Sequence, residues 1–156
     1  MKRLLSYFSF QGRTNRQRYW LTGLAIFGLV FVSALVATIA TRIPILGILV
    51  ALLLFAVILG AAVAGLANSA RRLHDRGKSA WWLLVFQGVP GLLSALRVLV
   101  SAGGGADAAG PAALLALIGL PFWIWAFVEL GCLRGTTGPN RFGDDPLGEP
   151  VQEVFA

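Results

Sequence analysis

Cysteine and histidine are almost absent from this chain of 156 residues. Cys132 and His74 are the only residues of their types. A single cysteine cannot form an intramolecular disulfide, and it excludes a cysteine-rich metal site. The redox state of the protein's compartment therefore cannot be inferred from its cysteine usage.

Apolar residues, in contrast, are abundant. They make up 57% of the chain, and the mean hydropathy is +0.77, whereas a soluble domain contains roughly 45–50% apolar residues. They form long blocks instead of the short alternating patterns of a soluble core. The block at 19–41 is longer than the roughly 7–15 apolar residues of a signal peptide. This excess is typical of a protein that lies in lipid.

Four segments are long and apolar enough to cross a bilayer, which takes roughly 20 residues of helix. They lie at about 19–41, 43–70, 79–99 and 111–130. Pro90 in the third segment and Pro121 in the fourth remove a backbone hydrogen bond and are expected to bend their helices. We predict an all-α fold, an integral membrane four-helix transmembrane bundle. It forms a single membrane domain over 1–156, with a C-terminal tail at 131–156.

Two features of the spans bear on their packing and role. Small residues recur in the second span, often four apart, and allow helix backbones to approach closely. They are Gly47, Ala51, Gly60, Ala61, Ala64, Gly65 and Ala67. We favour packing within the bundle over a homodimer interface. Apart from Arg97 and Glu129 near span ends, the spans carry no charge, which counts against a transporter or channel.

The basic residues are distributed unequally between the two ends of the predicted spans. Eleven of them lie before the first span, between the second and third, and after the fourth, whereas the opposite connections hold only Arg42 and Arg97. The positive-inside rule therefore places both termini in the cytoplasm. Although the net charge is +6, these residues flank apolar blocks, so contact with anionic lipid explains them better than a nucleic acid. We expect no nucleic-acid partner.

The connection between the second and third spans is the most charged segment. It reads Arg71-Arg72-Leu73-His74-Asp75-Arg76-Gly77-Lys78. Its first residues continue the second helix, and Gly77 is expected to end that helix in a left-handed conformation. We predict a tight hairpin in which Asp75 is ionised and paired with arginines. With the N-terminal arm and the C-terminal loop it would form a cytosolic cap.

This cap has two interpretations. Its charges either hold the hairpin in shape, with the arginines reaching toward the membrane surface, or they form an anion site in which guanidinium groups bind a lipid phosphate or a phosphorylated solute bidentately. The candidate residues for either role are Arg13, Arg16, Arg71, Arg72, His74, Asp75, Arg76, Lys78, Asn140, Arg141 and Asp145.

Catalysis is a weaker hypothesis for the same residues. His74 and Asp75 could act on a phosphorylated lipid, with Asp144 or Asp145 as metal ligands. A lone histidine beside one carboxylate is a weak catalytic signal, and two adjacent acids do not make a ligand set. We therefore predict no catalytic residue, no metal ion and no cofactor.

Three motifs of the sequence together resemble a known family. They are Phe10-x-Gly12-Arg13-x-x-Arg16-x-x-Tyr19-Trp20, Arg71-Arg72-Leu73-His74-Asp75-x-Gly77-x-Ser79-x-Trp81-Trp82 and Gly138-x-Asn140-Arg141-Phe142-Gly143-x-Asp145-Pro146. The chain resembles the YhaH-like bacterial inner-membrane proteins, domain of unknown function 805. The resemblance implies a small multi-pass protein of the inner (plasma) membrane, and it implies no reaction, substrate or cofactor.

The resulting expectation is a membrane protein without enzymatic activity. Its basic cap is expected to bind anionic lipid headgroups or a protein partner, and a homo-oligomer remains open. A membrane enzyme using His74 and Asp75 is the alternative, and a small transporter or channel ranks last.

Overall fold

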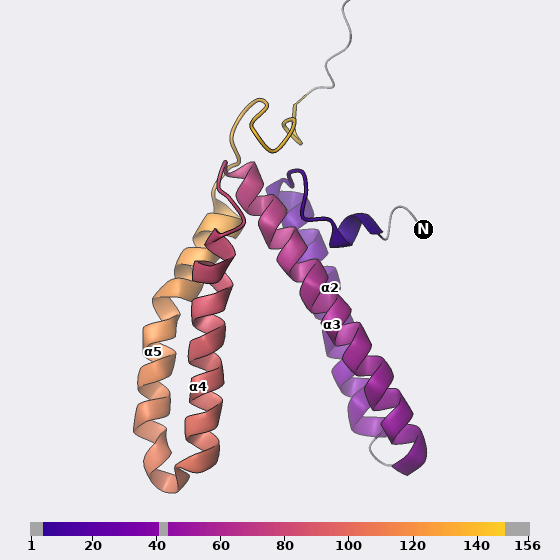
Figure 1. Cartoon of the computed structure of the whole chain (residues 1–156), viewed down its shortest axis with the longest axis vertical. Coiled ribbons are helices and arrows are strands. Elements are labelled where there is room, and N and C mark those ends of the chain that lie inside the picture. Colours follow the sequence, from indigo (N-terminus) through magenta and orange to yellow (C-terminus); the bar gives the residue numbers. More distant parts are fainter. Residues whose placement is uncertain (1–4, 41–43, 149–156) are drawn as a thin grey trace, which may run out of the picture.

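The computed structural model describes residues 5–40 and 44–148. Every named secondary-structure element within these residues is a helix (Figure 1). The long helices are α2 (Arg16–Ala40), α3 (Pro44–Asp75), α4 (Val89–Gly103) and α5 (Ala109–Ala126). Short 3-10 turns, η1 (Ser6–Phe8) and η3 (Gly105–Ala108), precede α2 and α5. Single π-helical segments, η2 (Leu84–Gly88) and η4 (Phe127–Cys132), lead into α4 and follow α5.

Within the described residues, four helical segments are long and apolar enough to cross a membrane, as the sequence predicts. They are Arg16–Ala40, Gly47–Asp75, Leu84–Gly103 and Ala109–Cys132. The all-α architecture with four membrane-capable helices is therefore confirmed. The predicted connection at Arg42, the basic residues Lys2 and Arg3, and the last residues of the tail lie outside the described residues.

The four helices are paired into two hairpins. Helix α2 packs along α3, and α4 packs along α5. Figure 1 shows that the hairpins meet at one end of the molecule and diverge toward the other. Within the described residues, α2 and α3 both contact η4, the last segment of the second hairpin. The bundle is thus tied together at one end.

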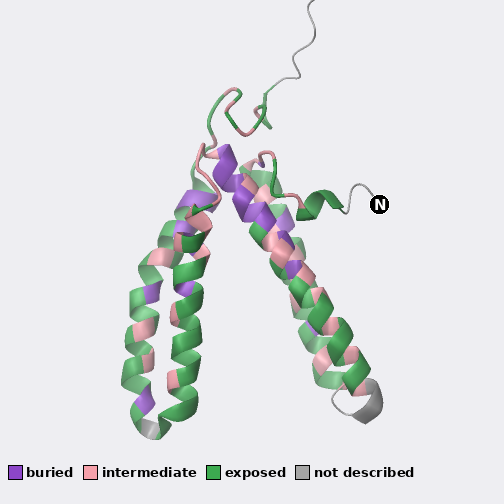
Figure 2. Cartoon of the chain, viewed as in Figure 1, coloured by how far each residue is buried: buried purple, intermediate pink, exposed green. Residues whose placement is uncertain are grey.

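Burial follows this arrangement. Buried residues gather where the hairpins meet, whereas the diverging parts of the hairpins are mostly exposed (Figure 2). Leu73, Phe86, Ala126 and Leu130 form a small apolar core at the junction. Large apolar side chains cover the outside of the hairpins, and that of Ile39, for example, is 70% exposed. Such a surface is suited to lipid and not to water.

Close to Pro90, where the sequence predicts a bend, the third span contains a π-helical turn. Segment η2 ends two residues before Pro90, which occupies the first turn of α4 and is buried. Proline has no backbone N–H to donate, and its ring clashes with the carbonyl group four residues earlier, so the preceding turn cannot keep its regular hydrogen bonds. Proline and π-bulges are both known sites of helix kinks. The turn places Phe86 in the junction core and Gln87 beside α3.

The small residues of α3 serve two different surfaces. Ala61, Ala64 and Ala67 are buried, which agrees with packing within the chain. In contrast, a Cβ atom added to Gly60 or Gly65 would meet nothing within 4 Å. Small residues in this helix therefore provide close packing at some positions and open space at others.

Candidate functional site

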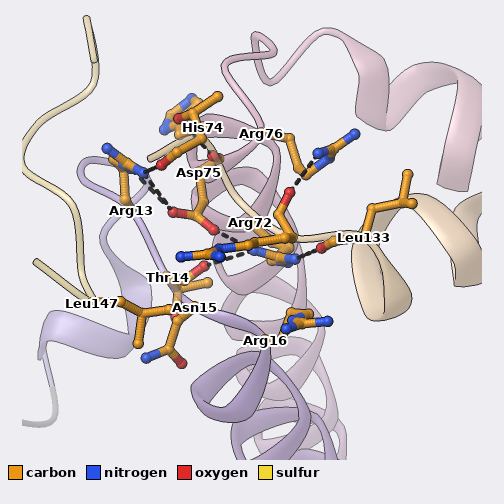
Figure 3. A network of polar contacts seen from close by, with 12 residues as sticks. Arg13, Thr14, Asn15, Arg16, Arg72, His74, Asp75, Arg76, Leu133 and Leu147 are labelled. Carbon is orange, nitrogen blue, oxygen red and sulfur yellow. Dashed lines mark hydrogen bonds and ion pairs between the residues drawn. The ribbon is translucent and has the colours of Figure 1, made fainter. Parts of the chain in front are cut away.

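Three segments that are far apart in the sequence meet at the joined end of the hairpins. We call this region the cap and define it as residues 9–15, 71–78 and 133–147. The end of α3 supplies its centre, while the N-terminal arm and the segment after η4 wrap around it (Figure 3). The structure thus brings together the three motifs that the sequence analysis singled out.

Arg72 is the most enclosed charge in the cap. Its side chain is 0% exposed. Nε donates to the carbonyl oxygen of Leu130 at 2.8 Å, and Nη1 donates to that of Thr14 at 3.4 Å. Nη1 also donates to the Asp75 carboxylate, and Nη2 to the Leu133 carbonyl oxygen. One guanidinium therefore joins α3 to the arm, to η4 and to the tail.

Arg13 approaches the same carboxylate from the arm. Its Nε and Nη2 lie 3.1 and 3.0 Å from Asp75 Oδ1. The remaining donors are used by the tail, with Nη1 donating to Gly138 O at 2.7 Å and Nη2 to Thr136 O at 2.6 Å. Because Asp75 also accepts from Arg72, the two arginines share one buried carboxylate. The predicted pairing of Asp75 is confirmed.

The tail docks on the last turn of α3 through backbone contacts. Thr136 donates to the Asp75 carbonyl oxygen from both its N–H, at 2.8 Å, and its hydroxyl, at 3.1 Å. Asn140 Nδ2 donates to the carbonyl oxygen of His74 at 3.0 Å. Gly135 lies so close that an added Cβ atom would overlap the Asp75 carboxylate. Its missing side chain is a steric condition for docking.

Gly77 has φ +70°, the left-handed conformation that the sequence predicts at the end of this helix. The chain then reverses toward η2, and Lys78 N–H donates to the Leu73 carbonyl oxygen at 2.9 Å. The hairpin between α3 and η2 is therefore tight, as expected.

His74 is held by its surroundings. Its ring stacks on Phe142 with 4.0 Å between the centroids and 6° between the planes. Nδ1 lies 3.2 Å from the Gly12 carbonyl oxygen. Arg141 lies over the Phe142 ring at 4.6 Å and donates to the Gly77 carbonyl oxygen at 3.4 Å. The contacts of His74 thus connect the arm, the hairpin and the tail.

Glu129 is a member of the polar network that sequence reasoning left without partners. Its Oε1 accepts from Arg76 Nε at 3.1 Å and lies 3.0 Å from Lys78 Nζ. The carboxylate is buried, with a side chain 6% exposed. The sequence offered one indication that Glu129 has a partner, because it is a single acid at the end of an otherwise uncharged span.

Other basic side chains lie around the edge of the cap with fewer contacts to the protein. Arg16 donates to the Cys132 carbonyl oxygen at 3.0 Å, and Arg71 donates to that of Ser6 at 3.1 Å. We call this edge the rim; its members are Arg16, Arg18, Arg71, Arg134 and Arg141. All except Arg71 are exposed.

Asp145 orders the tail loop. Its carboxylate accepts from the backbone N–H of Gly138 at 2.9 Å and of Leu147 at 3.0 Å. The N–H groups of Leu147 and Gly138 and the nearby Arg13 guanidinium lower the pKa of this carboxyl below its ordinary value. The ionised form therefore stabilises the loop.

The proposed catalytic grouping of His74, Asp75 and a tail acid does not form a ligand set. Within residues 5–40 and 44–148, no three His, Cys, Asp or Glu side chains come close enough to hold a metal ion. The cavity beside Arg72, Asp75 and Asp145 is only about 20 Å³. It has room for little more than a water molecule.

Comparisons with known proteins agree with the resemblance of the motifs. The family model described as "Protein of unknown function (DUF805)" matches residues 7–144. Inner membrane protein YhaH of Escherichia coli (strain K12) is 31% identical, with 96% of this chain and 97% of that protein covered. Inner membrane protein YhaI of the same strain is 28% identical, over 92% and 90%. No solved structure gives a significant match.

Proposed function

The chain belongs to the DUF805 family of unknown function, whose relatives are inner membrane proteins, and we propose that it is a non-enzymatic multi-pass protein of the bacterial inner membrane. In this proposal the cap lies in the cytosol, and its rim binds anionic lipid headgroups. The buried charges have a different role, because they hold the two helical hairpins together. The division between saturated inner arginines and exposed outer ones carries the proposal.

An anion must find free N–H donors, and the two inner arginines offer few. Arg72 is enclosed and donates to three carbonyl oxygens and one carboxylate. Arg13, whose side chain is 1% exposed, donates to the carboxylate of Asp75 and to carbonyl oxygens of the tail. These contacts support a structural role for the centre of the cap.

The rim has the chemistry that a lipid headgroup requires. Exposed guanidinium groups form charge-assisted hydrogen bonds with phosphate. The electrostatic attraction of each Lys or Arg to an anionic membrane surface is worth about 1 kcal/mol. Arg16 and Arg18 begin a membrane-capable helix, so they stand at the depth at which headgroups lie. The aromatic side chain of the neighbouring Trp20 is suited to the same interface.

The distribution of charge supports the orientation. The described Lys and Arg residues of the arm, the α3–η2 hairpin and the tail lie at the joined end of the hairpins, whereas Arg97 lies within α4. A cytosolic cap then satisfies the positive-inside rule. A reporter inserted between Gly103 and Gly110 is expected to be periplasmic.

His74 and Asp75 do not favour an enzyme. A general base must reach the proton that it removes, but Asp75 is 2% exposed and accepts from two arginines. The imidazole is stacked on Phe142 and lies beside a carbonyl oxygen. Both side chains are used in docking the three segments of the cap.

Native mass spectrometry of protein released gently from nanodiscs tests the rim. We expect the Arg16→Gln/Arg141→Gln variant to retain several-fold less anionic phospholipid than the wild type, because both guanidinium groups are exposed. Arg97→Gln is the control, since it removes one positive charge by the same substitution outside the cap. Equal retention by all three proteins would overturn the proposal, and so would equal loss in the control.

A further inference from the structure

A large cavity of the described structure lies outside the cap. It is an open groove of about 1000 Å³ between α2, α3 and η2. Its walls include Gly23, Phe27 and Val30 from α2, Ile58 and Gly65 from α3, and Leu84 from η2. This volume is at the upper end of the roughly 300–1000 Å³ typical of ligand pockets.

The groove is a consequence of small residues at defined places. A Cβ atom added to Gly23 or Gly65 would meet nothing within 4 Å. Both positions therefore open onto space that a larger side chain would fill. Because the two hairpins diverge away from the cap (Figure 1), this space faces the region between them.

The length of the groove matches one leaflet of a bilayer. Along α2 its lining residues run from Tyr19 to Val30, which corresponds to about 16 Å at 1.5 Å per residue. The hydrocarbon core of a bilayer is about 30 Å thick. The groove therefore begins beside the cap and ends near the middle of the membrane, which is the depth of one acyl chain.

The end of the groove nearest the cap is polar. Asn68, Ser69 and Gln87 all line it. Asn68 Nδ2 donates to the Tyr19 carbonyl oxygen at 3.1 Å, and Gln87 Nε2 donates to Ser69 Oγ at 2.9 Å. These bonds hold the side chains in place at the mouth of an otherwise apolar channel.

One acceptor at this end has no partner. Asn68 is 3% exposed, and its Oδ1 is buried without a hydrogen bond among the described residues. A buried polar atom without a partner is energetically unfavourable, because it has lost its hydrogen bonds to water and gained none in the protein. A ligand that brings a hydrogen-bond donor to Oδ1 would recover this energy, whereas a purely apolar ligand would not.

We propose that the groove binds one phospholipid from the leaflet on the cap side. An acyl chain lies between α2 and α3, and a donor in the polar part of the lipid bonds to Asn68 Oδ1. The occupant is a lipid because the walls are apolar, the length fits one leaflet and the surrounding solvent is the bilayer. This site does not depend on the charge of the rim, since no arginine lines it.

The donor requirement gives the site a chemical preference. Phosphatidylethanolamine carries an ammonium group with N–H donors, whereas the headgroup of phosphatidylcholine has none. Both lipids are zwitterionic, so a preference between them does not arise from the arginines of the rim. We expect the wild-type protein to retain phosphatidylethanolamine several-fold better than phosphatidylcholine.

The test uses full-length protein from nanodiscs of equal parts phosphatidylethanolamine and phosphatidylcholine, with retained lipid counted by native mass spectrometry. Gly65→Leu and Gly23→Leu fill the groove and are expected to lose most of the bound lipid. Gly60→Leu and Gly28→Leu are matched controls on α3 and α2, because their Cβ atoms also meet nothing within 4 Å and neither residue lines the groove. Asn68→Ala is expected to abolish the preference for phosphatidylethanolamine.

Each alternative result contradicts the proposal. Equal lipid retention by Gly65→Leu, Gly23→Leu and the controls would exclude the groove as the site. A preference that survives Asn68→Ala would exclude the bond to Oδ1. A lipid-free dimer in the mass spectrum would mean that a second copy fills the groove. The rim is tested with anionic lipid, so either proposal can fail without the other.

Discussion

The two ends of the helical hairpins are held by different forces. At the joined end, the cap contributes buried ion pairs and hydrogen bonds, and a small apolar core lies beside it. At the diverging end, each helix packs mainly on the partner within its own hairpin and exposes large apolar side chains (Figures 1 and 2). The relative placement of the hairpins is therefore decided in the cap.

The physical reason is the solvent. Apolar side chains gain little by leaving lipid for a helix surface, so burial of apolar area drives helix association weakly in a membrane. Hydrogen bonds and ion pairs with defined geometry supply specificity instead. Glycines along the hairpins, such as Gly65 in α3, leave open space where the core of a soluble protein would contain a side chain. Substitutions that remove contacts of the cap are therefore expected to affect stability more than substitutions elsewhere.

Arg72→Met is expected to have the largest effect. It removes the guanidinium that joins α3 to the arm, to η4 and to the tail, and it leaves Asp75 with one fewer partner. Breaking a buried pair costs about 3–5 kcal/mol, so we expect a loss of that order in the free energy of unfolding. Denaturant unfolding in detergent measures it.

Arg97→Met in α4 is the control for that experiment. It removes the same side chain outside the cap, and it is expected to change the free energy of unfolding by less than about 0.5 kcal/mol. A comparable loss in both variants would mean that the cap is not the region that stabilises the molecule.

Gly135→Ala is expected to have a smaller effect. The added methyl group would overlap the Asp75 carboxylate, so the tail must move away from α3. Such overpacking typically costs about 1–3 kcal/mol. We expect the tail to become sensitive to limited proteolysis while the hairpins remain resistant. Gly110→Ala, where a Cβ atom meets nothing within 4 Å, should leave the digestion pattern unchanged.

Acidification is expected to have the smallest effect, and it acts through Asp145. The pKa of its carboxyl is lowered by the N–H groups of Leu147 and Gly138. A group whose pKa is lowered by folding stabilises the fold above its ordinary value, about 3.9. That contribution is lost as the pH falls through the lowered pKa of the folded state. The tail loop should therefore loosen only in strong acid.

Hydrogen exchange of the tail at a series of pH values detects this transition. In Asp145→Asn the tail should be looser already at neutral pH, with no added step in acid from this group. An acid transition of the same size in the variant would assign it to a different carboxyl.

Part of the cap was predictable from the sequence, and part was not. Asp75 among three arginines predicted an ionised, paired carboxylate, and Gly77 predicted the end of the helix. The identity of its second partner, Arg13, was not predictable, because 62 residues separate the two and only the fold brings them together. Glu129 was missed for the same reason, since Arg76 and Lys78 lie on a different segment.

The sequence alone determined that this protein lies in lipid and where its long helices occur. In lipid every backbone N–H and C=O must be paired within the protein, and a helix does so within a single segment. Uncharged blocks of roughly 20 residues have the length of membrane-spanning helices. Only the tertiary structure decided which arginines are buried and which stay on the rim, and where the helices separate. Those outcomes depend on contacts between distant segments, and the periodicity of one helix carries no information about them.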